Sequence, residues 1–148
     1  MAYSSNLDLL KEIAPEELAK LTGSPGGGLI DPERMAYARG NADGIINAYL
    51  YGRYPVPFSE PIDPLIVRLS CDLTMVNLYE YMYRGSIIST TILNRKIEAI
   101  GILERLQNGK LSLQGYEQGS GTVTAIITNK ELDSRVFSDV LLDGFINE

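Results

Sequence analysis

The sequence predicts a mainly α-helical protein: a bundle of about five helices with an extended C-terminal tail that contains a short β-strand. Helix start signals stand at Asp31-Pro32 and Asp63-Pro64. Apolar residues recur at helical spacing after both signals. β-branched residues gather only later, in TVTAIIT. We therefore divide the chain into a helical body, residues 1–113, and a flexible spacer with a C-terminal tail, residues 114–148.

The first two expected helices are short. Asn6 can cap a helix that extends from Leu7 to about Ile13. Pro15 occupies a favourable first helical position and opens a second helix, PEELAKL. The glycine-rich stretch GSPGGG follows and is interpreted as a turn that joins two helices.

The third helix is expected from Pro32 to about Tyr51. Its apolar stripe comprises Met35, Ala38, Ala42, Ile45 and Tyr49. The small residues on this stripe, with Gly40 and Gly44 nearby, indicate close packing against another helix.

The fourth helix opens at Asp63-Pro64, after an extended connection that contains four prolines, YPVPFSEPIDP. It carries two apolar stripes, one of Ile66, Leu69, Leu73 and Val76 and another of Cys71, Met75, Leu78 and Met82. Two apolar faces predict a central, buried helix. A fifth helix is expected over residues 91–107, and Asn108-Gly109 should end it in a left-handed cap.

The tail raises a hydrogen-bonding problem, because one strand after a helical body leaves its backbone groups unpaired. We expect a neighbouring copy or another protein to supply the missing partner by strand addition. The alternatives are that the tail folds back on its own helices or pairs with the extended segment around Val56. The candidate docking residues are Val123, Ile126, Ile127, Val136, Phe137, Leu141, Leu142 and Phe145.

Composition argues against most enzyme classes. The chain has no histidine, which is the commonest general base and transition-metal ligand, and a single cysteine, Cys71. We therefore expect no catalytic site, no metal and no cofactor. An enzyme that uses carboxylates such as Asp72 and Glu80 would lack any further polar constellation. No apolar run approaches the roughly 18 residues that span a bilayer, and the first residues show no secretion signal.

Charge is unevenly spread along the chain. Residues 1–33 and residues 111–148 each hold two basic and six acidic residues, whereas residues 34–110 hold nine basic and seven acidic ones. This pattern lacks the concentrated positive face of a DNA-binding protein. It suits a chain whose ends contact a neighbour's middle. Chance variation on a solvated surface is the alternative.

The stretch from Gly23 has part of the spacing of a calcium-binding EF-hand loop. The positions that should supply oxygens hold Gly23, Pro25 and Gly27, and the twelfth position holds Arg34. One remaining carboxylate, Asp31, cannot replace a cage of about six to eight oxygens. The stretch also lacks the lysine of a phosphate-binding loop. An EF-hand-like regulatory module therefore stays only a distant alternative.

Several motifs together resemble those of the Mu-like prophage head–tail connector proteins. They are Leu21-Thr22, Ile30-Asp31, YLYGRYPVP from Tyr49 to Pro57, RLSCD from Arg68 to Asp72, GKLSL at 109–113 and FSDVLLDGF near the end. The chain departs from that family in lacking the loop acids. The motif positions carried over are Tyr49, Gly52, Arg53, Tyr54, Pro57 and Asp72.

The resemblance implies a structural virion protein of the head–tail junction. Such proteins assemble in the bacterial host cytoplasm as a ring, commonly of twelve copies, beneath the portal protein. The ring extends the DNA channel, through which DNA passes without sequence-specific binding, and docks the next connector or tail protein. A tail-completion or stopper protein of the same junction is the related alternative. No membrane is involved in either case.

Two motif residues carry opposite charges, Arg53 and Asp72. We expect them to form a bidentate pair that fixes the proline-rich connection onto the central helix. The alternative is that both side chains are solvated and unpaired.

Overall fold

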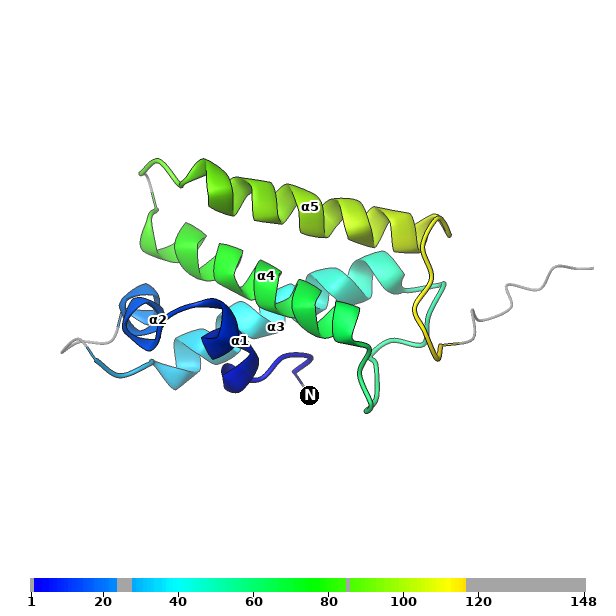
Figure 1. Ribbon diagram of the computed structural model, residues 1–148, viewed down its shortest axis with the longest axis horizontal. Helices are drawn as coiled ribbons and strands as arrows, with labels where there is room; N and C mark the ends of the chain where they lie inside the picture. Colours follow the sequence, from blue (N-terminus) through cyan, green and yellow to red (C-terminus); the bar gives the residue numbers. More distant parts are fainter. Residues whose placement is uncertain (1, 24–27, 85, 117–148) are drawn as a thin grey trace, which may run out of the picture.

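The computed structural model describes residues 2–23, 28–84 and 86–116. Its helices are α1 (Asn6–Glu12), α2 (Pro15–Thr22), α3 (Pro32–Leu50), α4 (Pro64–Met82) and α5 (Thr90–Gln107) (Figure 1). These five helices confirm the expected mainly α-helical bundle. Over the described ranges the only β-type pairing is an isolated bridge between Tyr51 and Tyr54. The strand expected in TVTAIIT lies outside these ranges.

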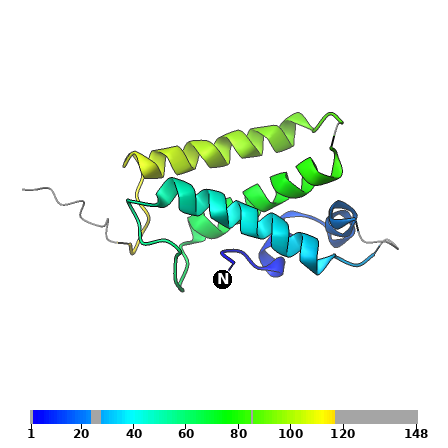
Figure 2. The same ribbon diagram turned by 180° about the vertical axis from the view of Figure 1, so that it is seen from behind.

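Helix α4 lies at the centre of the body and contacts each of the other four helices. In Figure 1, α3 crosses behind α4, α1 and α2 lie on the nearer side, and α5 runs alongside. Figure 2 shows the reverse arrangement, with α3 in front. The sequence-based prediction of a central, buried fourth helix is therefore confirmed.

The two apolar stripes of α4 contribute to two separate clusters of buried side chains. Ile66, Leu69 and Leu73 pack with residues of α3, α5 and the proline-rich connection. Cys71, Met75 and Leu78 pack with residues of α1, α2 and the first part of α3. Met82, expected on the second stripe, is 47% exposed because it is the last residue of the helix.

Helix α3 packs as expected only over its first half. Met35, Ala38 and Ala42 are buried, but Ile46 and Leu50 then take the buried positions, while Ile45 and Tyr49 are half-buried. The helical period of 3.6 residues shifts the buried stripe by one position over these turns. The close packing expected from the small residues of this stripe is found at Ala38 and Ala42, which are buried, but not at the nearby glycines: at Gly40 and Gly44 an added Cβ would meet no atom within 4 Å.

The helix ends explain where the elements begin. Asp31 and Asp63 accept hydrogen bonds from the first backbone N–H groups of α3 and α4, as expected. Helix α1 differs, because Ser5 and not Asn6 is its N-cap, in a reciprocal capping box with Asp8. Gly109, just after α5, has a φ of +75°, which confirms the left-handed cap.

The residues before α1 are held to the body by a buried polar cluster. The Asp43 carboxylate accepts hydrogen bonds from Ser70 Oγ at 2.7 Å and from the Tyr3 backbone N–H at 3.0 Å. The Ser4 and Ser70 hydroxyls lie 2.9 Å apart. Burial raises the pKa of Asp43 above its usual value, although both hydrogen bonds oppose the rise. The cluster joins the N-terminal segment to α3 and α4.

The raised pKa of Asp43 predicts a defined pH dependence of stability. The folded chain keeps the Asp43 proton at pH values where the unfolded chain has released it, so stability from this group falls as pH rises. We expect the unfolding free energy of wild type, minus that of Asp43→Asn, to decrease from about pH 3 to about pH 7. Urea titrations at several pH values measure it. An increase over the same range would show that the hydrogen bonds outweigh burial.

Candidate functional site

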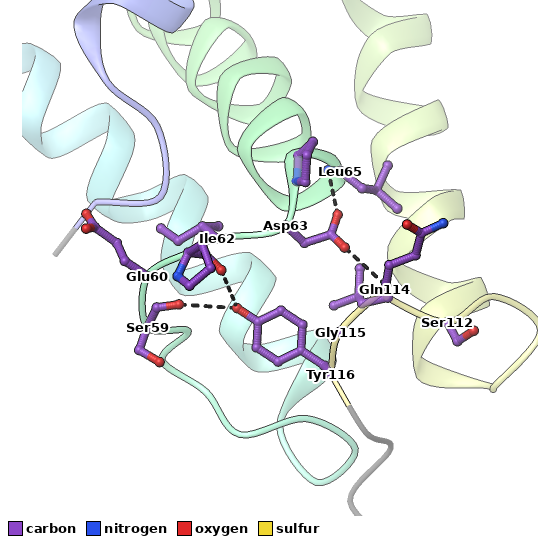
Figure 3. A pocket seen from close by; sticks show the side chains of 12 residues that line it. Ser59, Glu60, Ile62, Asp63, Leu65, Ser112, Gln114, Gly115 and Tyr116 are labelled. Carbon is purple, nitrogen blue, oxygen red and sulfur yellow. Dashed lines mark hydrogen bonds between the residues drawn. The ribbon is translucent and has the colours of Figure 1, made fainter.

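The candidate site lies where the proline-rich connection between α3 and α4 meets the chain that leaves α5 (Figure 3). We call residues 109–116 the tail root, because they are the last described residues before the C-terminal segment. The YLYGRYPVP motif and the GKLSL motif, far apart in the sequence, meet here.

A tight turn at the end of α3 shapes the first motif. Gly52 has a φ of +93°, a left-handed conformation that suits glycine. The backbone N–H groups of Arg53 and Tyr54 both donate to the Leu50 carbonyl oxygen at 3.1 Å. The turn thereby directs Tyr54, which is 4% exposed, into the core.

Tyr54 joins the first motif to the tail root. Its hydroxyl oxygen lies 3.4 Å from the Leu113 backbone nitrogen, which donates to it. Leu113 is itself buried in the same cluster as Tyr54 and Phe58. Phe58 is fixed in turn by its backbone N–H, which donates to the Tyr3 hydroxyl at 3.0 Å.

Arg53 makes a second contact between the motifs. Its guanidinium lies across Gly109, where an added Cβ would come within 2.6 Å of Nη1. The positive φ favours glycine at Gly109, and an added Cβ would in addition displace the end of the Arg53 side chain. The guanidinium is also 5.9 Å from the centre of the Tyr54 ring. Its buried Nε has no hydrogen-bond partner among the described residues.

Asp63 connects the tail root to the central helix. One carboxylate oxygen accepts from the Leu65 N–H at 2.8 Å and caps α4, and the other accepts from the Gln114 N–H at 3.2 Å (Figure 3). A single side chain therefore defines both the first turn of α4 and the path of the chain after α5.

Tyr116 attaches the end of the tail root to the connection. Its hydroxyl lies 3.2 Å from the carbonyl oxygens of both Ser59 and Pro61 (Figure 3). Its ring meets the Phe58 ring edge to face, with centroids 4.9 Å apart. Residues 59–65 and 112–116 also line a cavity of about 590 Å³, whose charged side chains are the acids Glu60 and Asp63. This lining favours an apolar or cationic segment over an anion.

The expected pair between Arg53 and Asp72 is wrong. Asp72 binds Arg95 of α5 at 2.8 Å and lies 3.7 Å from Arg68, one turn earlier on α4. Arg95 also reaches Glu12 of α1 at 3.4 Å. The reason is position along the bundle: Asp72 faces α5 and α1 in the middle of α4, whereas Arg53 lies beside Gly109, where α5 has ended. Burial raises the pKa of Asp72, and Arg95 opposes the rise.

The remaining candidate residues are less informative. Tyr49 is half-buried against the core, and Pro57 is exposed. The docking residues proposed for the tail, from Val123 to Phe145, lie outside the described residues. The described parts of the chain hold no group of three or more histidine, cysteine or acidic side chains that could bind a metal ion. No described helix is long and apolar enough to cross a lipid bilayer.

Comparison with known proteins places the chain in a phage family. The model of the family described as Bacteriophage Mu, Gp36 matches residues 3–125, which is most of the chain. The chain belongs to the Bacteriophage Mu Gp36 family. It is thus a Mu-like phage protein. A search of curated proteins gave no match.

Sequence reasoning missed several residues that build this site of the Gp36-family chain. The sequence marks Asp63 only as a helix cap, and its second bond, to Gln114, has no local signal. Tyr116 falls in the predicted flexible spacer, because QGYEQGSG is rich in glycine and polar residues. Outside this site, Ser5 is the missed N-cap of α1, and it could have been found, since Ser5 and Asp8 have the spacing of a capping box.

The double role of Asp63 predicts a specific loss of protection. Asp63→Ala should lower the unfolding free energy by about 0.5–2 kcal/mol through loss of the cap. It should also speed hydrogen exchange at the Gln114 amide, which loses its acceptor. Asp31→Ala is the matched control, because it removes the cap of α3 but touches no residue of the tail root. Equal exchange at Gln114 in both variants would contradict the connection.

The corrected partner of Asp72 is testable by double-mutant cycles. The cycle of Asp72→Ala with Arg95→Ala should give a coupling energy of about 0.5–3 kcal/mol, because the two side chains touch. In the cycle of Asp72→Ala with Arg53→Ala, the two changes in unfolding free energy should add, because these side chains do not touch. Chemical denaturation measures both, and coupling only in the second cycle would restore the original expectation.

Proposed function

We propose that this chain is a head–tail connector, or adaptor, of a Mu-like phage. Copies form a ring beneath the portal protein, extend the DNA channel and dock the next connector or tail protein. The role is structural, with no catalysis and no cofactor. The family match supports a phage protein, and the motif resemblance supports this particular place in the particle.

The observation that carries the proposal is the way the body holds the tail root. Tyr54, Asp63 and Tyr116 tie it to the proline-rich connection and to the start of α4. This attachment suits a C-terminal segment that binds a partner. Any force on that segment would then pass through the tail root to the helical body. The segment that follows is rich in apolar residues, from Val123 to Phe145.

The charge of the chain fits passage of DNA. The net charge is −6, and a channel wall with few lysine or arginine contacts holds phosphates weakly. DNA can then slide without sequence-specific binding. The ring itself requires a contact between two different faces of neighbouring copies, because a ring is a heterologous assembly.

A genetic test in the phage that encodes this chain addresses the proposed role. With a stop codon early in the gene, we expect heads and tails to accumulate unjoined, and the full chain supplied in trans to restore infectious particles. A chain that ends after Tyr116 should keep the helical circular dichroism of the body but fail to restore them. That chain retains every described contact of the tail root, so its failure would reflect the missing segment.

Electron microscopy of the defective particles separates the related roles. Malformed tails on otherwise complete particles would indicate a tail-completion protein. Joined, infectious particles without the chain, or full rescue by the shortened chain, would contradict the proposal or its docking arm respectively.

A further inference from the structure

A positively charged surface lies between the first part of α3 and the last part of α4. The guanidinium groups of Arg34 and Arg84 lie 4.2 Å and 4.7 Å from the centre of the Tyr81 ring. Arg34 is fixed further by bonds to the Thr22 carbonyl oxygen at 2.6 Å and to the Tyr81 hydroxyl at 2.8 Å. Neither arginine forms a salt bridge with any described residue. The arginine surface, as we call Arg34, Tyr37, Tyr81 and Arg84, therefore keeps its positive charge.

The acid that lines the same cavity as these arginines is paired with another residue. Glu80 shares the same cavity, of about 270 Å³, but binds Lys96 of α5 at 2.5 Å. Tyr37 lines this cavity too and is 67% exposed. An exposed tyrosine beside arginines is a typical anchor of protein interfaces.

A second hollow lies on the other flank of α4. It measures about 460 Å³ and is lined by Ala14, Glu16, Glu17, Lys20, Leu21, Met82 and Tyr83. Met82 and Tyr83 are 47% and 44% exposed, so its wall is apolar and open. Two carboxylates against one ammonium give it a negative rim. We call it the acidic groove.

The wall of the acidic groove is ordered by its neighbours. Tyr83 stacks on Tyr79, with ring centroids 6.0 Å apart and planes 12° apart. The Tyr79 hydroxyl donates to Glu17. The groove is therefore formed in the single chain and does not need a partner to create it.

We infer that the arginine surface of one copy binds the acidic groove of the next, with Tyr37 inserted between Met82 and Tyr83. Charge complementarity indicates a second copy as the partner of the acidic groove. Arg34 and Arg84 of that copy would place positive charge beside the rim that Glu16 and Glu17 make negative. The two surfaces share no residue: one lies between α3 and α4, and the other lies between α2 and the end of α4. The contact is thus head to tail and joins copies in series. This inference rests on the proposed ring and names its interface.

Cross-linking between two variants of the full chain, each with one introduced cysteine, tests this contact. Asn41→Cys places a thiol at the arginine surface and Lys20→Cys places one at the acidic groove, both at exposed positions. The native Cys71 is buried and its pKa is raised to about 11, so it should stay unreactive. The two variants, one enlarged by a tag, are mixed at high concentration and treated with a short bismaleimide. We expect the mixed dimer to predominate over both homodimers.

Added substitutions show whether the named side chains make the contact. Tyr37→Ala in the Asn41→Cys chain should lower the yield of mixed dimer about tenfold or more, as loss of an aromatic anchor does. Tyr51→Ala is the matched control, because Tyr51 is 79% exposed but lies at the other end of α3. Arg84→Glu should also lower the yield, and Glu16→Arg in the Lys20→Cys chain should restore it.

Each result of the cross-linking decides the inference. No mixed dimer, equal yields of all dimers, or indifference to Tyr37→Ala would overturn it. The proposed function would still stand if the full chain restored particles in the phage, because a ring could then use another face. Mixed dimers from a chain that does not join heads to tails would preserve the contact and remove the proposed role.

Discussion

The burial of α4 on two sides is the constraint on which the rest of the structure depends. One face of this helix closes a cluster with α3 and α5, and the other closes a cluster with α1 and α2. Each fully buried leucine or isoleucine contributes about 1.5–3 kcal/mol relative to exposure. Without α4, both clusters would lose the helix that they share. The charged residues on the same helix must therefore find partners at its margins, as Asp72 does with Arg95.

The tail root shows how this bundle supports a chain segment that leaves it. The turn at Gly52 brings Tyr54 inward, and Tyr54 then meets Leu113 beyond the end of α5. Arg53 covers Gly109 at the same point. Two motifs with 51 residues between them thus act as one structural unit. The polar contacts are individually weak, about 0.5–1.5 kcal/mol each, but they act together on a short segment.

Much of the fold could be predicted from the sequence because its signals are local. Asp-Pro pairs mark the starts of α3 and α4, and two apolar stripes mark α4 as central. The tertiary partners could not be predicted in this way. The opposite charges of Arg53 and Asp72 suggested a pair, but their distance along the bundle prevents it, and Arg95 carried no motif that singled it out. Buried Asp43 is similar, since its partners Ser70 and Tyr3 come from distant segments.

The shared carboxylate of Asp63 has a mechanical consequence. The same side chain begins α4 and holds the backbone of Gln114, so a pull on the chain that passes the contacts of Tyr116 acts next on the first turn of α4. Because every other helix rests on α4, tension at one end of the molecule spreads through the whole body. A force from an attached neighbour that reaches α4 would therefore be shared among the four helices that pack against it.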